Sequence, residues 1–235
     1  RQGAGTGALV SGTYFDTIGT RHDKDEDGNA TARRQPKRLH ASSMKLTHGD
    51  FMFSGRYQDF RYQNVSSPDT KTTTFRDRTA LIGLLWRHGY GDRLALNARA
   101  YHNVFDWPQE KESYKAGTGA LSKIEKRTEK TQATGGGFQA EFEAPGGHSL
   151  IGGLDIEVQE GREIEETTVK TNVANPVPTV TRFADPASPT ETSWAAFLQD
   201  TWHFRPDWRA VAGVRYDSPQ AIKGQASPRA ALIYA

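Results

Sequence analysis

The residues best placed to bind a metal ion lie in one acidic stretch near the N-terminus, HDKDEDGNATARR. Asp23, Asp25 and Asp27 stand at alternate positions and Gly28 follows them, which is the spacing that opens a calcium-binding loop. Carboxylate oxygens suit a hard cation such as Ca²⁺, so calcium in this loop is the one cofactor that the sequence offers, and we expect no other. Arg34 stands where such loops carry a bidentate glutamate. A solvated acidic loop, partly neutralised by arginines, is therefore the competing interpretation.

A second set of reactive side chains could bind a ligand. Arg56, Arg99 and Arg215 could hold an anionic ligand or a neighbouring domain, because guanidinium groups pair well with carboxylates and chelate oxygens. Tyr101 and His102 are candidate contacts for the same ligand, and His102 could coordinate iron if that ligand were haem. The alternative is an interstrand ladder in which the arginines pair with acidic residues. Those acidic residues are Glu141, Glu143, Asp155 and Glu157.

These side chains lie in segments where polar and apolar residues alternate, which is the period of a β-strand. In SWAAFLQDTWHFRPDWRAVAGVRYD, two alternating runs flank a turn at Arg205–Asp207 and predict a hairpin. The same pattern predicts ten antiparallel strands and no sustained helix. We expect the strands at 7–15, 38–47, 51–60, 78–87, 93–105, 136–144, 149–159, 193–204, 208–217 and 226–235.

The connections between these strands alternate strictly in length. Short turns rich in Gly, Pro and Asp are expected near Gly49, Gly91, Gly146 and Pro206. Long polar loops are expected at 16–37, 61–73, 108–131 and 160–192. A soluble β-sandwich has no reason to alternate in this way, whereas an outer-membrane barrel has short periplasmic turns and long external loops. The sequence therefore predicts an all-β, antiparallel transmembrane β-barrel.

Composition excludes several other classes of protein. The chain has 235 residues, no Cys, a formal net charge of +2 and a mean hydropathy of −0.71. Without Cys there is neither a disulfide scaffold nor a thiolate metal site, and the mild, evenly spread charge does not favour a nucleic-acid partner. No apolar run reaches the roughly 18 residues of a transmembrane helix. Low hydropathy is compatible with a barrel, because a barrel strand needs an apolar residue only at every second position.

Aromatic residues gather at both ends of the expected strands. Those beside short turns are Phe51, Trp86, Tyr90, Trp202, Phe204 and Trp208. Those beside long loops are Tyr14, Phe60, Tyr62, Phe105, Trp107, Trp194 and Tyr216. Two such sets, one strand length apart, predict the two aromatic girdles of a barrel, with small apolar residues facing lipid between them. The alternative is the general preference of aromatic residues for strands.

The hairpin at 193–217 and the SPRAALIYA segment after it resemble one family, the TonB-dependent outer-membrane receptors. The matching residues are Gln199, Asp200, Trp202, Gly213, Arg215, Tyr216, Asp217, Ser227, Pro228, Arg229 and Tyr234. The resemblance implies a barrel of about 22 strands around an N-terminal plug. It also implies energised uptake of a ferric siderophore, haem or a cobalamin-like ligand across the bacterial outer membrane, without covalent chemistry.

On this resemblance, residues 1–235 form a barrel segment without the plug and the remaining strands. The expected partners are outer-membrane lipid, a metal-chelate ligand and the TonB complex, the last through a plug outside this chain. Two other functions stay open. A complete ten-strand barrel could carry an omptin-like protease site, for which Asp106 and His102 are the best acid–base pair on offer. A structural or adhesive barrel would need no such site.

Overall fold

The computed structural model describes residues 5–18, 36–66, 71–114, 120–170, 179–184 and 190–234. These residues form one antiparallel sheet of eleven strands, which confirms the predicted all-β fold. The strands are β1 (Thr6–Thr17), β2 (Lys37–His48), β3 (Phe51–Ser66), β4 (Lys71–Tyr90), β5 (Leu94–Tyr114), β6 (Leu121–Ala144), β7 (His148–Lys170), β8 (Thr179–Ala184), β9 (Glu191–Arg205), β10 (Trp208–Pro219) and β11 (Gln225–Tyr234). Within the described ranges, no helix is long and apolar enough to cross a membrane.

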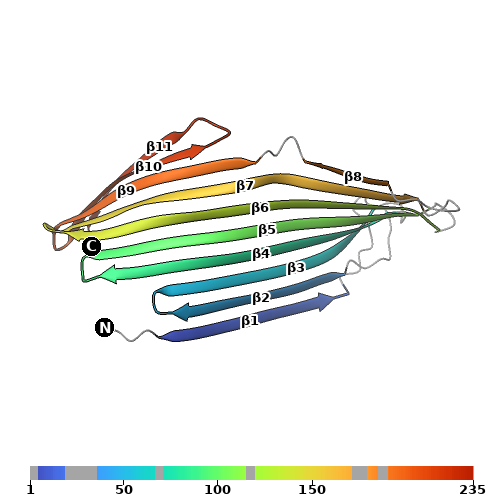
Figure 1. Ribbon diagram of the computed structural model, residues 1–235, viewed down its shortest axis with the longest axis horizontal. Helices are drawn as coiled ribbons and strands as arrows, with labels where there is room; N and C mark the ends of the chain where they lie inside the picture. The colour runs from blue at the N-terminus through green and yellow to red at the C-terminus, as the bar shows by residue number, and fades with distance from the viewer. Residues whose placement is uncertain are drawn as a thin grey trace.

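The strands follow one another across the sheet almost in chain order (Figure 1). The order is β1-β2-β3-β4-β5-β6-β7-β9-β10-β11. The short strand β8 pairs with one part of β7, Glu163–Thr168, while β9 pairs with another, His148–Gln159. The ten strands of the main path correspond to the ten predicted strands, and β8 falls in a segment predicted as a loop. Among the described residues β1 and β11 do not pair with each other, so the sheet is open.

Tight turns connect the strands at one end of the sheet, which we call the turn end. Gly49, Gly91, Gly146 and Gly147 adopt positive φ there, at 55°, 64°, 86° and 82°. Glycine takes this conformation without steric cost, whereas other residues would be strained. The short turns therefore lie where the sequence predicts them. In Figure 1 they gather at the left edge, and we call the opposite edge the loop end.

The strands run further toward the loop end than the sequence predicts. β4 to β7 have 20 to 24 residues, about twice the length that a tilted strand needs to cross a membrane. Much of the predicted loops at 61–73, 108–131 and 160–192 is therefore strand. The hydrophobic alternation fades in these extensions because most of their residues are polar on both faces, but the backbone pairing continues. Cross-strand ion pairs such as Lys126 to Glu110, at 2.7 Å, support the pairing.

The sheet has two chemically different faces, and the pairing register assigns each residue to one of them. The outer face carries apolar side chains such as Ile82, Leu154 and Leu198, which are 51%, 60% and 57% exposed. Because a single layer has no interior, the described residues include just two buried apolar side chains, Ile164 and Ala195. An apolar face this exposed needs a non-aqueous partner, and a lipid bilayer provides one. The inner face carries most of the charged residues at the level of this apolar surface.

The apolar part of the outer face has the height of a membrane. On β4 the outward residues from Tyr90 to Ala80 are aromatic or apolar apart from His88, and the outward Arg78 and Arg76 follow toward the loop end. Ten steps of about 3.3 Å, tilted by about 40°, rise about 25 Å, which matches the apolar belt of outer-membrane barrels. We call this part of the outer face the apolar band.

The pairing register places some of the aromatic residues on a different face of the sheet from the one predicted. All six at the turn end lie on the outer face, as a girdle requires. The outward aromatic residues near the loop end are Tyr14, Trp194 and Tyr216. Those that lie on the inner face instead are Phe60, Tyr62, Phe105 and Trp107. The prediction that these last four belong to the lipid-facing girdle is therefore wrong, and they are free to contact something inside the barrel.

This arrangement predicts which strand ends are accessible from outside the cell. The chain has no native Cys, so single cysteines can be introduced without background. In intact cells, a membrane-impermeant maleimide should label Lys170→Cys and Thr179→Cys, which are exposed at the loop end, but not Asp92→Cys or Asp207→Cys in the turns. Lysed cells are the control, because all four positions should then react. Equal labelling of both sets in intact cells would contradict the topology.

Candidate functional site

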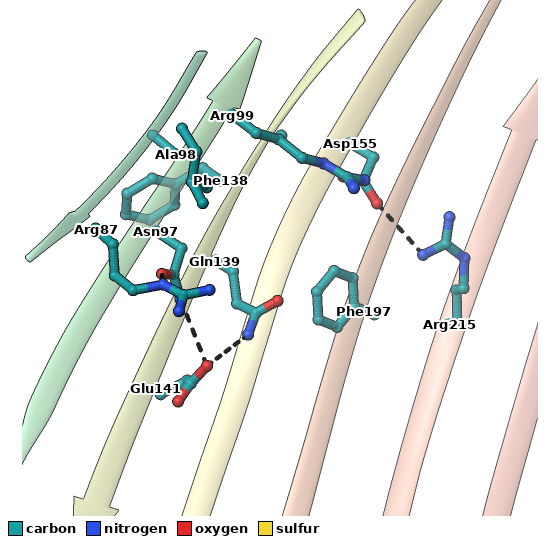
Figure 2. Close-up of a pocket in the computed structure, with 12 residues that line it drawn as sticks. Arg87, Asn97, Ala98, Arg99, Phe138, Gln139, Glu141, Asp155, Phe197 and Arg215 are labelled. Carbon is teal, nitrogen blue, oxygen red and sulfur yellow. Dashed lines mark hydrogen bonds and ion pairs between the residues drawn. The ribbon is translucent and has the colours of Figure 1, made fainter. Parts of the chain in front are cut away.

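An ion-pair network lies on the inner face across β5, β7 and β10 (Figure 2). Asp155 on β7 accepts a hydrogen bond from Arg99 on β5 at 2.8 Å and pairs with Arg215 on β10 at 3.4 Å. Arg215 also pairs with Asp217 at 2.9 Å. Arg99, Asp155 and Arg215 line a hollow of about 420 Å³. The network therefore links strands that do not pair with one another directly.

A glycine lets Tyr101 reach across a whole strand. The register aligns Tyr101 on β5, Gly135 on β6 and Glu157 on β7 in one row. Tyr101 lies over β6 and donates a hydrogen bond to Glu157 at 2.5 Å. A Cβ at Gly135 would overlap the hydroxyl and ring of Tyr101, so only glycine leaves room for this bridge.

The same arrangement recurs in two further rows. Gly137 lies between Arg99 and Asp155, and a Cβ at this glycine would overlap the Asp155 carboxylate. A third row, on β11, β10 and β9, consists of Arg229, Gly213 and Gln199. In that row the guanidinium again donates a hydrogen bond across the glycine to the far side chain. Three glycines on the inner face thus permit cross-links between second-neighbour strands.

Each charged group of the network has a partner. Arg99 and Arg215 face Asp155, Asp217 and Glu157, and each of these carboxylates already accepts from a basic or hydroxyl donor. The geometry therefore favours the interstrand ladder over a dedicated anion site at these two arginines. Both arginines are about half exposed, so each ion pair stabilises the sheet by ~1 kcal/mol or less.

Three of the five predicted ligand contacts lie together, because Arg99, Tyr101 and Arg215 line one hollow of about 310 Å³ on the inner face. Arg56 shares the inner face but lies on β3, where it donates a hydrogen bond to Gln58 at 3.4 Å. Within the part of the chain that the structure describes, no contact joins Arg56 to the network. The role of Arg56, Arg99, Tyr101 and Arg215 in ligand binding stays a prediction.

The other predicted contact, His102, lies on the outer face. Its Nδ1 is 2.8 Å from Thr134 Oγ1, and its neighbour Tyr101 points to the opposite side. Asp106, the proposed acid partner of His102, pairs with Arg78 at 2.9 Å. Four residues along one strand place the two Cα atoms about 13 Å apart, too far for an acid–base pair. The structure therefore does not assemble the protease pair, and His102 is not positioned to share a ligand with Tyr101.

The predicted calcium ligands Asp23, Asp25 and Asp27 lie outside the described residues. Among the residues that the structure does describe, no group of three or more His, Asp or Glu side chains could hold a metal ion. The calcium site therefore stays a prediction.

A second hollow, of about 520 Å³, lies on the inner face nearer the loop end, and Tyr62, Asp77, Phe105 and Trp107 are among its lining residues. We call it the aromatic hollow. Beside it, rings on β3, β4 and β5 form a continuous stack with centroid separations of 5.3, 5.0 and 6.1 Å. The stacked residues are Phe60, Tyr62, Phe75 and Trp107. Such a stack offers a flat apolar surface to another planar group.

Asp77 lines the aromatic hollow, beyond the level of the apolar band, and one of its carboxylate oxygens has no partner in the part of the chain that the structure describes. Its Oδ1 is buried and has no hydrogen-bond partner among the described residues. Burial raises the pKa of Asp77, and burial followed by the charge of Asp77 raises the pKa of Tyr62. The carboxylate of Glu129 in the same hollow does have partners, because Arg127 and Arg162 pair with it at 2.7 and 2.9 Å. Asp77 is therefore the acceptor that a ligand could use.

The phase of the alternation was the signal that could have found the aromatic hollow. Phe60 and Tyr62 are in phase with Arg56 and out of phase with the lipid-facing Tyr57, so a strand extended to this point places both rings inside. The prediction instead sorted aromatic residues by their distance from strand ends. Asp77, between two arginines in a segment without apolar alternation, gave no such signal.

An open antiparallel sheet with a membrane-high apolar band, tight turns at one end and long strands at the other defines part of an outer-membrane β-barrel. Residues 10–235 match the family model described as TonB dependent receptor-like, beta-barrel. The chain belongs to this TonB-dependent receptor β-barrel family, whose members are bacterial outer-membrane proteins, and its location is the outer membrane.

The sheet resembles parts of solved outer-membrane proteins. The copper transporter OprC superposes with a TM-score of 0.56 at 14% identity, over 96% of this chain and 37% of OprC. BauA, the ferric preacinetobactin receptor from Acinetobacter baumannii, has a TM-score of 0.49 at 16% identity, over 97% of this chain and 39% of BauA. A comparison with curated protein sequences finds no match. The likeness to OprC shows the fold alone, and the chain spans well under half of the length of either protein.

Proposed function

We propose that this chain is part of a receptor that takes up a metal chelate, such as a ferric siderophore or haem, across the outer membrane. The observation that carries the proposal is the inward-facing aromatic hollow near the loop end of a barrel of this family. A ligand that arrives from outside the cell meets this end of a barrel first. OprC, a protein of similar fold, is named a copper transporter, which agrees with a metal-containing ligand.

The aromatic hollow suits a ligand with flat groups and at least one hydrogen-bond donor. Trp107, at the end of the ring stack, would stack on the flat groups, and Tyr62, between Phe60 and Phe75, would add apolar ring contact beside it. Asp77 would accept the hydrogen bond and so replace the hydration that burial removes from its carboxylate. This chemistry differs from the anion binding that the inner-face arginines first suggested. Arg99 and Arg215 are not free for an anionic ligand, because Asp155 and Asp217 already pair with them.

The proposal includes the energy source that the family resemblance implies. The TonB complex would act on a plug outside this chain, and the barrel segment would supply the wall and the outer binding surface. No covalent step is involved, so the proposal assigns the chain no enzymatic activity. Calcium in the first long loop would be an additional ligand of the protein and is not needed for the uptake itself.

Uptake of labelled metals tests the proposed function. Cells with and without the gene are given radiolabelled iron as haem or as catecholate, hydroxamate or citrate chelates, and radiolabelled copper as a separate probe. We expect one of these probes to accumulate only when the gene is present, and accumulation to stop when an uncoupler collapses the proton-motive force. Failure of every probe to accumulate in a gene-dependent way would contradict metal-chelate uptake.

Tyr62→Ala should weaken binding of the transported chelate about tenfold or more, because it removes a ring from the stack that faces the aromatic hollow. The matched control is Tyr57→Ala, which removes the same side chain from the outer face of the same strand. Equilibrium binding to isolated outer membranes measures both variants. An unchanged affinity in Tyr62→Ala would remove the aromatic hollow from the binding site, and equal losses in both variants would indicate misfolding.

A further inference from the structure

Three arginines lie side by side on the outer face, just beyond the apolar band. The register aligns Arg38 on β2, Arg61 on β3 and Arg76 on β4 in a single row, which we call the arginine row. Neighbouring strands are about 4.8 Å apart, so three positive charges are held close together. Like charges directly opposite one another destabilise a sheet unless something neutralises them.

The protein neutralises the two flanking members of the arginine row but not the central one. Arg38 pairs with Asp16 at 3.0 Å, and Arg76 pairs with Asp59 through two hydrogen bonds. Arg61 is exposed, and none of the described residues forms an ion pair or a side-chain hydrogen bond with it. The central guanidinium is therefore available to an anion that does not belong to this part of the chain.

The adjacent row, nearer the apolar band, is built differently. It consists of His40, Asp59, Arg78, Asp106 and Lys130. From β3 to β6 the charges in that row alternate in sign, and Arg78 pairs with Asp106 at 2.9 Å. In a row that alternates in this way, each charge lies opposite a charge of the other sign. The arginine row lacks this alternation and takes Asp59 from the adjacent row as the partner of Arg76, which leaves Arg61 without a counter-ion among the described residues.

A shallow hollow of about 300 Å³ opens beside the arginine row on the outer face. Arg61, Arg76, Arg78 and Lys126 contribute four cationic groups to its lining. The acid in this lining is Glu110, and Lys126 pairs with it at 2.7 Å. The hollow therefore retains one uncompensated positive charge, surrounded by donors that the sheet holds in place.

We propose that the arginine row binds the phosphate group of a lipid in the outer leaflet. A planar guanidinium matches phosphate oxygens in two-pronged hydrogen bonds, and a phosphate over Arg61 can also reach the neighbouring arginines. The position favours a lipid over a free anion, because the apolar band begins two outward positions below the row, at Tyr57 and Ala80. The acyl chains of the same molecule would lie against that band. This inference concerns the lipid-facing surface and does not depend on the uptake proposal.

Lipid binding to the protein purified from outer membranes in detergent tests the inference. The probes are diphosphorylated lipid A and the same lipid after enzymatic removal of its phosphates, and native mass spectrometry measures the bound lipid. Wild type should bind the phosphorylated probe about tenfold or more tightly than the other. Arg61→Gln should lose most of this preference, and Arg61→Lys, which keeps the charge without the planar fork, should lose part of it.

The matched control is Arg93→Gln, the same substitution at an exposed arginine in a turn at the opposite membrane boundary, and it should keep the full preference. Replacement of Arg61 leaves no described group without a partner, so we expect the variant to fold, and heat-modifiability on gels checks this. Equal binding of the two probes, or a preference that survives in Arg61→Gln, would overturn the inference. So would displacement of the lipid by an equal concentration of inorganic phosphate, because the row would then be a free-anion site.

Discussion

Gly135→Ala should destabilise the folded barrel by about 2–4 kcal/mol, although it adds a single methyl group. The new Cβ would overlap Tyr101 and lie 2.9 Å from the carbonyl oxygen of Ile156. Tyr101 would have to leave its place over β6 and lose the hydrogen bond to Glu157. Overpacking and the loss of a hydrogen bond to a charged group each cost about 1–3 kcal/mol. Urea unfolding of the whole protein in detergent, followed by circular dichroism, measures the change.

The matched control for this prediction is Gly89→Ala. Gly89 also lies in a strand on the inner face, but apart from its chain neighbours no atom lies within 4 Å of the place that a Cβ would take. The substitution should therefore change stability by less than about 1 kcal/mol. A double-mutant cycle tests whether the cost of Gly135→Ala arises from its contact with Tyr101. In a Tyr101→Ala background, Gly135→Ala should cost at least about 1 kcal/mol less than in wild type, because the side chain that needs the space is gone. Additive effects would show that Gly135 does not act through Tyr101.

The strand pattern was predictable because it depends on local chemistry. Alternation marks a strand wherever one face meets lipid, and Gly49, Gly91 and Gly146 mark turns that need positive φ. The extensions beyond the membrane were not predictable in this way. Past Arg78 on β4, Phe75 is the one apolar side chain and the rest are polar, so strand and loop have nearly the same composition there. Only the pairing with neighbouring strands distinguishes them, and pairing is a property of the whole sheet.

The candidate sites show a similar division between local and long-range information. Arg99, Tyr101 and Arg215 could be assigned to one face from alternation alone. The sequence alone could not show that Tyr101 crosses Gly135 to reach a third strand. That contact depends on the register of β5, β6 and β7. The arginine row depends on register as well, since its members come from three strands and are far apart in sequence.

The two parts of the inner face have different physical characters, which suggests a division of roles. At the level of the apolar band, Arg99 and Tyr101 bridge second-neighbour strands, and their charges and hydroxyls are matched within the wall. Such bridges hold the register of long strands. Nearer the loop end, Tyr62 and Asp77 present ring surface and an unmatched acceptor. We therefore expect ligand contact mainly in the half of the inner face nearer the loop end, where these rings and this acceptor lie.

The 235 residues on their own should aggregate in detergent and should not refold to a monomer. The sheet has two edges, β1 with 12 residues and β11 with 10, and neither pairs with the other in the described structure. Each unpaired backbone group costs several kcal/mol in hydrocarbon, so an open sheet is not stable there. Association with the edges of other copies satisfies these groups. The uptake proposal expects further strands of the protein to cover both edges.

Both faces of the β1 edge promote this association. Leu9 on the inner face is 65% exposed and Val10 on the outer face is 74% exposed, so the bare edge carries apolar side chains on both sides. Leu9→Lys places a charge on that edge and should slow aggregation. It should not yield a folded monomer, because the unpaired backbone groups of β1 and β11 remain. Light scattering measures the rate, and heat-modifiability on gels detects a closed barrel. A monodisperse, heat-modifiable monomer from the unmodified chain would mean that β1 pairs with β11. The wall would then enclose a pore of about ten strands, which is too narrow for a bulky chelate, and the receptor proposal would fail with it.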